Sequence, residues 1–239
     1  MEISKGIQIQ GLALLIKPEN ILVIGDTHIG MEAALNEEGM LIPRFQFNEI
    51  MQETKKIIKK TKPKLIILNG DIKHNFGSIS RQEWQNTKKY LELLEKNSKV
   101  IFIKGNHDTI LGPIAEKQNV EIKKHYKIRD IYVCHGHEIP RDKEYEEAKR
   151  IIIGHEHPAI SLREGPRTEK YKCYLKGKHE SKELIVMPSM TMVNEGTDVL
   201  KEKLLSPFLK DKSIKNFEAY LLGDKVYYFG KIQGFSNIN

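Results

Sequence analysis

ILVIGDTH, residues 21–28, decides the fold, because a short apolar run leads through a glycine into two side chains that can bind metal. The same succession recurs in KLIILNGD (64–71), KVIFIKGNHD (99–108), DIYVCHGH (130–137) and RIIIGHEH (150–157). Short runs rich in Ile and Val, bounded by glycine, are typical of strands that are buried on both faces. The sequence therefore predicts a sheet protein in which five strands end at polar, ligand-type residues.

These strand-end residues form one set of candidate metal ligands. The carboxyl ends of adjacent strands meet at one edge of a sheet, so we expect the set to gather there. Its members are Asp26, His28, Asp71, Asn106, His135, His155 and His157. Oxygen and imidazole ligands without cysteine favour two divalent ions, Mn²⁺ first, with Zn, Fe, Ni or Co as alternatives. Two ions about 3.5 to 4 Å apart with a shared carboxylate would use all seven, and this arrangement serves displacement at phosphorus.

The rest of the chain predicts one α/β domain over residues 1–239. Further strands are expected at 11–16 and 183–187, with a terminal hairpin at 217–222 and 225–229. A helix begins after Ser80, which forms a capping box with Glu83. Another follows Pro43, where Ile50, Met51, Thr54, Ile57 and Ile58 form an apolar stripe. The sequence has no internal repeat and no Gly/Ser-rich linker.

Composition narrows the class of protein. The chain has 239 residues, 39% of them hydrophobic and 30% charged, which excludes a membrane protein and a disordered low-complexity chain. Thirty-nine Lys and Arg against 32 Asp and Glu give a net charge of +7, which favours anionic partners. Cys134 and Cys173 stand outside any ligand spacing and are expected to be reduced and buried. The first twenty residues are expected to form strand and not a signal peptide, so we expect a cytoplasmic protein without a membrane partner.

A basic segment stands out between residues 158 and 182. It interleaves lysines and arginines with Tyr171 and Tyr174 and is predicted to be a hairpin or loop insertion. Either Arg167 and Lys170 contact a nucleic-acid backbone, or the lysines only keep a solvated edge hairpin from pairing. Arg44 has two similar interpretations, a phosphate clamp or a surface arginine.

The motifs GDTH, GD, GNHD, HGH and GHEH, in this order over residues 22–190, resemble the calcineurin-like metallophosphoesterase superfamily. The resemblance implies an α/β fold, a four-layer α/β/β/α sandwich of two mixed sheets faced by helices. It further implies that Asp26, His28, Asp71 and His157 hold one ion. Asp71, Asn106, His135 and His155 would hold the other, with Asp71 bridging the two. His137 would lie behind the ligands or exchange with one, and we also count it among the candidate substrate-binding residues.

The resemblance also implies catalytic roles. His107 matches the family's histidine that contacts the phosphate and protonates the leaving group, with Asp108 orienting it. His74, in GDIKH, resembles the SbcD-like nuclease branch and is expected to position the phosphate or share the role of His107. The insert NEEGMLIPRFQF (36–47) and the basic segment resemble small ICC-like phosphoesterases, which include ligase- or helicase-associated DNA endonucleases.

Three functions follow from these observations. The first is a metal-dependent phosphodiesterase or nuclease that acts on DNA through a metal-activated hydroxide, in DNA repair and beside a helicase or ligase. The second is a small-molecule phosphatase or cyclic-nucleotide phosphodiesterase, which needs the same ions but no basic track. The third is a non-catalytic binding scaffold, which requires lost ligands, whereas this sequence keeps them all.

Overall fold

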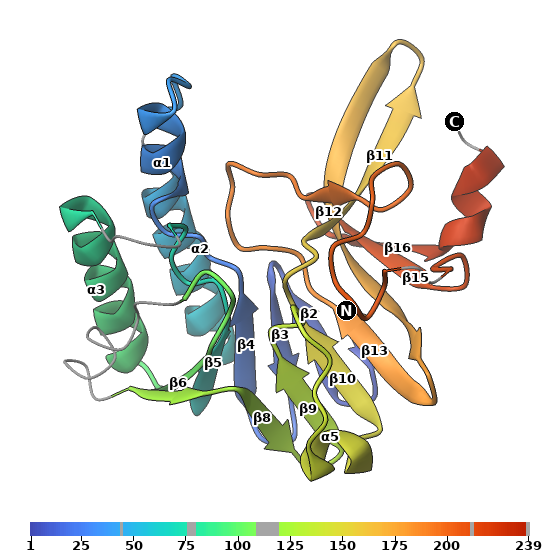
Figure 1. Cartoon of the computed structure of the whole chain (residues 1–239), viewed down its shortest axis with the longest axis horizontal. Helices are drawn as coiled ribbons and strands as arrows, with labels where there is room; N and C mark the ends of the chain where they lie inside the picture. Colours follow the sequence, from blue (N-terminus) through green and yellow to red (C-terminus); the bar gives the residue numbers. More distant parts are fainter. Residues whose placement is uncertain (44, 76–79, 109–119, 211–212, 238–239) are drawn as a thin grey trace. The chain divides into compact units, whose positions relative to one another are not determined.

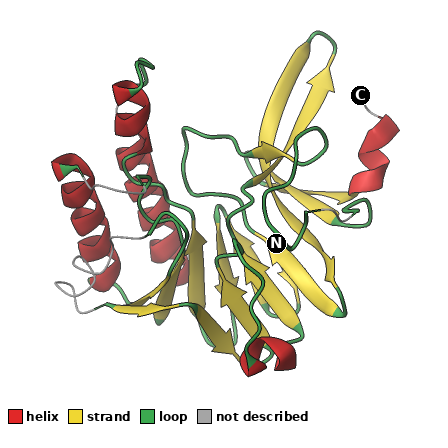
Figure 2. Ribbon diagram, viewed as in Figure 1, coloured by secondary structure: helices red, strands yellow, loops and turns green. Residues whose placement is uncertain are grey.

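Two β-sheets organise the chain, and each belongs to a separate unit. The computed structural model describes residues 1–239 except 44, 76–79, 109–119, 211–212 and 238–239 (Figure 1). Unit 1 comprises residues 1–124 and 190–194, and unit 2 comprises residues 125–189 and 195–239. The long helices belong to unit 1, whereas unit 2 consists mainly of strands (Figure 2).

The sheet of unit 1 follows the order of the sequence. Its strands are β1 (Glu2–Ser4), β2 (Ile7–Gln10), β3 (Ala13–Ile16), β4 (Ile21–Gly25), β5 (Leu65–Asn69), β6 (Lys99–Ile103) and β7 (Glu121–Lys123). Strands β1 to β4 pair antiparallel and β4 to β7 pair parallel. The strand expected at 11–16 begins at Ala13, because Gly11, with φ 61°, opens a turn after β2. The carboxyl ends of β4, β5 and β6 therefore lie side by side.

Within the described residues, unit 1 contains three helices. They are α1 (Met31–Glu37), α2 (Gln46–Thr61) and α3 (Arg81–Glu95). The predicted stripe of α2 is confirmed at Ile50, Thr54, Ile57 and Ile58, which are all buried. The predicted start of α3 is also confirmed, since the Ser80 hydroxyl accepts a hydrogen bond from the Glu83 N–H at 3.1 Å.

The sheet of unit 2 has a parallel centre formed by three predicted strands. Strands β9 (Ile131–Cys134), β10 (Arg150–Ile153) and β13 (Lys182–Val186) pair in parallel around β10. The other strands are β8 (His125–Ile128), β11 (Pro158–Glu164), β12 (Arg167–His179), β14 (Thr197–Asp198), β15 (Glu218–Leu222) and β16 (Val226–Lys231). Strands β11 and β12 form an antiparallel hairpin within the basic segment. The predicted terminal hairpin is confirmed as β15 and β16.

The described part of unit 2 has few helices, α5 (Lys143–Glu147) and the 3₁₀ helix η1 (Ile232–Asn237). Both sheets mix parallel and antiparallel pairs, so the predicted α/β class with two mixed sheets is confirmed. Cys134 and Cys173 are buried and free of disulfides, as expected. None of the described helices is both long enough and apolar enough to cross a membrane.

Candidate metal centre

Unit 1 places four of the seven expected ligands at the ends of adjacent parallel strands. Asp26 and His28 follow β4, Asp71 follows β5, and Asn106 follows β6. The carboxylates are withheld from water, since Asp26 is 0% and Asp71 2% exposed. Burying two carboxylates in one place is unfavourable unless hydrogen-bond donors or cations compensate their charge. The donor set of unit 1 therefore fits a divalent ion.

The backbone at the expected ligands is strained. Among the described residues, nine other than glycine have a positive φ, and five of these are expected ligands. They are Asp26 (51°), His28 (42°), Asp71 (44°), His155 (63°) and His157 (50°). Such conformations cost of order 1 to 3 kcal/mol each and cluster at functional sites. In unit 1 the loops are fixed by hydrogen bonds from Asp26 N to Gly70 O (3.2 Å) and from His28 N to Asp71 O (2.9 Å).

The Asp71 carboxylate lies at the centre of the unit 1 site. Its Oδ1 accepts a hydrogen bond from the His107 N–H at 2.9 Å. Its Oδ2 lies 4.0 Å from His28 Nε2 and 3.9 Å from His107 Nε2. A Cβ atom at Gly105 would stand 2.2 Å from Asp71 Oδ1, so only glycine allows the β6 loop to approach this carboxylate.

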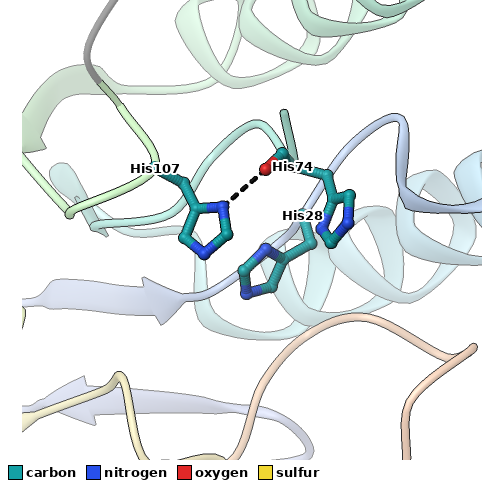
Figure 3. Close-up of side chains that lie close together, drawn as sticks. All are labelled: His28, His74 and His107. Carbon is teal, nitrogen blue, oxygen red and sulfur yellow. Dashed lines mark hydrogen bonds between the residues drawn. The ribbon is translucent and has the colours of Figure 1, made fainter. Parts of the chain in front are cut away.

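Three histidines of unit 1, His28, His74 and His107, lie close together (Figure 3), and two of them, His28 and His107, lie within 4.0 Å of the Asp71 carboxylate. The ring centroids of His28, His74 and His107 lie 5.2 to 5.7 Å apart, and each ring offers a nitrogen within 4.8 Å of the others. Burial lowers the pKa of His74, and the neighbouring His107 lowers it further. The lowered pKa of His74 favours the neutral imidazole, whose free ring nitrogen can bind an ion.

His107 is held through one ring nitrogen. Its Nδ1 lies 2.5 Å from the His74 carbonyl oxygen, as the dashed line in Figure 3 shows. A carbonyl only accepts hydrogen bonds, so Nδ1 carries hydrogen and Nε2 remains to exchange a proton with a substrate. The Asp108 carboxylate accepts from the N–H groups of Ile72 and Gly105, both at 3.0 Å. It thus joins the loops after β5 and β6, and the orienting contact on Nδ1 comes from His74.

Sequence reasoning missed the role of Glu83, which it assigned to a capping box alone. The buried Glu83 carboxylate accepts from the N–H groups of His74 (3.2 Å) and Asn75 (3.3 Å) and from the Asn75 side chain (3.2 Å). It therefore fixes the loop whose carbonyl holds His107. A glutamate three residues after an N-cap serine predicts a capping box, but it does not predict hydrogen bonds to the His74 loop.

Replacing Glu83 by alanine is expected to lower the free energy of unfolding by about 2 kcal/mol, because two backbone N–H groups lose a buried acceptor. Hydrolysis should also fall about tenfold, since the His74 carbonyl no longer holds His107 in place. Urea unfolding and steady-state rates measure both effects. The matched control is Glu92→Ala, on the same helix, where the carboxylate is 44% exposed. Unchanged stability and rate in Glu83→Ala would contradict the positioning role.

Unit 2 groups the remaining expected ligands at the ends of two adjacent parallel strands. His135 follows β9, and His155 and His157 follow β10. The His135 and His155 ring centroids lie 5.0 Å apart, and His137 lies 5.3 Å from His135. Unit 2 therefore presents a compact set of imidazoles that fits a transition-metal ion.

A buried set of hydrogen bonds, here called the clamp, joins the two histidine loops of unit 2 and was not predicted from the sequence. Glu156, 0% exposed, accepts from the N–H groups of Leu205 (2.9 Å) and Ser206 (2.8 Å). The Ser206 hydroxyl donates to the Gly136 carbonyl at 2.7 Å. The clamp thereby links the β10 loop to the β9 loop and holds their histidines together.

The candidate substrate residues of the hairpin do not share a surface. Arg167 pairs with Glu164 and Lys170 with Ser161, so alternation along the strand places Arg167 and Lys170 on opposite faces of the hairpin. The Lys170 ammonium donates to the Gly196 carbonyl (3.2 Å) and to Glu202 (3.0 Å). Arg44 lies outside the described residues.

Several known proteins are similar to this chain in sequence or in structure. A sequence model described as calcineurin-like phosphoesterase matches residues 19–214. The structure is similar to Pseudomonas putida nuclease MPE, with 16% identity, 91% of this chain and 92% of that chain covered, and a TM-score of 0.65. Yfce, a phosphoesterase from E. coli, has 9% identity, coverage of 85% and 88%, and a TM-score of 0.40. Wild-type Vps29 from Entamoeba histolytica, complexed with Zn²⁺, has 17% identity, coverage of 87% and 96%, and a TM-score of 0.38. No curated protein sequence matches the chain.

Proposed function

The chain belongs to the calcineurin-like phosphoesterase family and is thus a hydrolase of phosphoric esters, and we propose that its substrate is the phosphodiester backbone of DNA. The single observation that carries this proposal is the hydrogen bond from His107 Nδ1 to the His74 carbonyl oxygen. This bond leaves Nε2 of His107 beside the Asp71 carboxylate. A nucleic-acid alkoxide is a poor leaving group and needs a proton, whereas an activated phenol does not. A histidine held in this way suits an unactivated diester.

Two divalent ions, Mn²⁺ first, complete the proposed site. We assign Asp26, His28, Asp71 and His157 to one ion and Asp71, Asn106, His135 and His155 to the other. When bound, such ions lower the pKa of a water molecule towards about 7 and neutralise the phosphoryl oxygens. Asp26 and Asp71 are the two carboxylates of the set, and the neutral Asn106 leaves a positive surplus that attracts the phosphate.

The chain's own residues would handle substrate and protons. The imidazolium of His107 donates the Nε2 proton to the leaving oxygen as the P–O bond breaks, while Nδ1 keeps its bond to the His74 carbonyl. His74, whose lowered pKa favours the neutral imidazole, contacts the phosphate. His137 lies beside the unit 2 ligands, where it would contact substrate.

Cellular context forms part of the proposal. The fold shared with Pseudomonas putida nuclease MPE is one that a nuclease uses, and the net charge of +7 suits a nucleic acid. We propose action in DNA repair, beside a helicase or ligase and in the cytoplasm, where Cys134 and Cys173 would stay reduced. The second candidate is a small-molecule phosphodiesterase, and the internal bonding of Lys170 favours it over a DNA track on the hairpin.

One comparison of substrates tests the function. Purified protein with Mn²⁺ is assayed on single-stranded DNA, duplex DNA, bis-p-nitrophenyl phosphate and p-nitrophenyl phosphate, before and after chelation. We expect DNA and the diester to be cleaved in a metal-dependent manner. Hydrolysis of the small esters alone would support the second candidate instead.

Replacing His107 by alanine is expected to slow DNA cleavage by about 10² to 10⁴-fold, the usual contribution of a general acid. Bis-p-nitrophenyl phosphate should lose far less, because nitrophenolate leaves without protonation. Initial rates on both substrates, with metal content measured alongside, give the comparison. His125→Ala, on β8, is the control. Equal losses on the two substrates would contradict protonation of the leaving group by His107. They would indicate that His107 contacts the phosphoryl oxygens or the ions instead.

A further inference from the structure

A dense group of positive charges lies on unit 1, around the carboxyl end of α2. Residues 53–64 contain six lysines and one acid, Glu53, and so carry a local net charge of +5. All six lysines are exposed: Lys55, Lys56, Lys59, Lys60, Lys62 and Lys64. Within the described part of the chain, the one ion pair in this group joins Lys56 Nζ to Glu53 at 3.7 Å.

The basic segment (158–182) differs in this respect, because three of its lysines donate hydrogen bonds to the protein itself. Besides Lys170, Lys172 donates to the Ser189 carbonyl (3.0 Å) and hydroxyl (2.7 Å). Lys182 donates to the carbonyls of Glu146 (2.7 Å) and Ala148 (2.6 Å). The exposed lysines of residues 53–64 are therefore better placed than Lys170, Lys172 and Lys182 to meet an external polyanion.

The α2 lysines border a groove of about 540 Å³. Its lining is Lys55, Ile58, Lys59, Lys62, Pro63, Leu93 and Asn97, from the ends of α2 and α3, which lie next to each other (Figure 1). Lys55 and Lys59 are spaced i, i+4 and share one face of α2, and Lys62, the residue after the helix, lines the same groove. A rise of 1.5 Å per residue separates Lys55 from Lys59 by about 6 Å along the axis, within reach of neighbouring phosphates on one strand.

Stabilisation of the helix accounts for part of this charge only. The helix dipole places about half a negative charge at the C-terminus, and its effect fades within the last turn. Lys59 and Lys60 occupy that turn, whereas Lys55 precedes it and Lys62 follows the helix. The remaining lysines repel one another, and a bound polyanion would relieve this repulsion.

We propose that the lysine groove, Lys55, Lys59 and Lys62, binds the sugar–phosphate backbone of the substrate away from the reacting phosphate. This inference rests on the proposed nuclease function and adds a dependence on substrate length. The groove adjoins the start of β5, and Asp71 follows the end of this strand. The five residues of β5 therefore separate the groove from Asp71 by about 17 Å. At about 3.4 Å per nucleotide, the spacing along each strand of a duplex, a dinucleotide does not reach both.

The test compares Lys55→Ala/Lys59→Ala/Lys62→Ala with a control of equal charge change, Lys17→Ala/Lys203→Ala/Lys215→Ala, whose three lysines are also exposed. Binding of a labelled DNA 20-mer is measured in EDTA at several salt concentrations. Removing three phosphate contacts should reduce the log–log salt slope by about 2 to 3 and weaken binding on the order of 10²-fold at 0.1 M salt. With Mn²⁺, cleavage of the 20-mer should fall to a similar degree, while dinucleotide and bis-p-nitrophenyl phosphate hydrolysis stay within about twofold. The control should match wild type.

The possible failures are distinguishable. An unchanged salt slope and unchanged 20-mer cleavage overturn the lysine groove and leave the nuclease function intact. An equal loss on bis-p-nitrophenyl phosphate also overturns it, because the lysines would then act on the active centre. If poly-glutamate displaces the labelled 20-mer as well as unlabelled DNA of the same charge does, that result would overturn the DNA assignment. It would indicate that the groove binds an acidic protein. Wild-type protein that hydrolyses the small diester, yet neither binds nor cuts the 20-mer, overturns the nuclease function itself.

Discussion

Asp71→Asn is expected to abolish nearly all metal-dependent hydrolysis, with a loss on the order of 10³-fold. A metal ion contributes several kcal/mol to the stabilisation of a phosphoryl transition state, and each 1.36 kcal/mol is a factor of ten in rate. Asp71 is the carboxylate that we assign to both ions, and asparagine supplies a neutral, weaker ligand. The substitution is nearly isosteric, so the Oδ1 atom can still accept from the His107 N–H.

Two measurements check this result. Metal content by mass spectrometry should fall together with the rate on bis-p-nitrophenyl phosphate, while the melting temperature without metal changes little. Asp224→Asn, in the exposed turn between β15 and β16, controls for the same chemical change. An Asp71→Asn protein that retains two ions and the wild-type rate would end the bridging assignment.

Gly105→Ala is expected to lower the free energy of unfolding by about 3 kcal/mol or more. The added Cβ would stand 2.2 Å from Asp71 Oδ1 and 2.3 Å from Asp71 N, so the β6 loop or the carboxylate has to move. For a chain of this size the melting temperature should drop by about 6 to 12 °C. Metal binding should weaken as well.

Gly25→Ala supplies the matched control in the neighbouring loop. There the nearest atom to an added Cβ is the Asn69 carbonyl oxygen at 3.9 Å, an ordinary van der Waals distance. We expect this variant to melt within a few degrees of wild type. If Gly105→Ala has the same melting temperature as Gly25→Ala, the loop after β6 relaxes freely. The close approach of Gly105 to Asp71 would then not constrain the loop.

The strand-end motifs were predictable because strand burial and ligand chemistry are both local properties. The run at 21–24 and the residues Asp26 and His28 lie in eight consecutive positions, so one pattern carries fold and site together. Parallel pairing of β4, β5 and β6 then follows from apolar runs of similar length. The strands β7 and β8, with sequences EIK and HYKI, were not predicted, because their short, mixed segments carry no apolar periodicity.

The supports of the site depend on long-range contacts, and the sequence does not reveal these. Glu83 shows the signature of a cap, yet its carboxylate turns to the His74 loop. Ser206 reaches Gly136 across seventy positions of sequence. The lysines of the hairpin form a charge run in sequence, whereas in the structure Lys170 and Lys172 bind carbonyl, hydroxyl and carboxylate oxygens.

The left-handed backbone at five expected ligands also limits how this chain can diverge. Valine, isoleucine and threonine avoid this conformation, whereas asparagine and glycine tolerate it. A lineage that abandons catalysis while it keeps the fold should therefore replace these ligands mostly by asparagine or glycine. Relief of the strain would make such a descendant more stable than its enzymatic ancestor. The backbone conformation that orients the ligand side chains thus restricts which residues can replace them when an enzyme evolves into a non-catalytic scaffold.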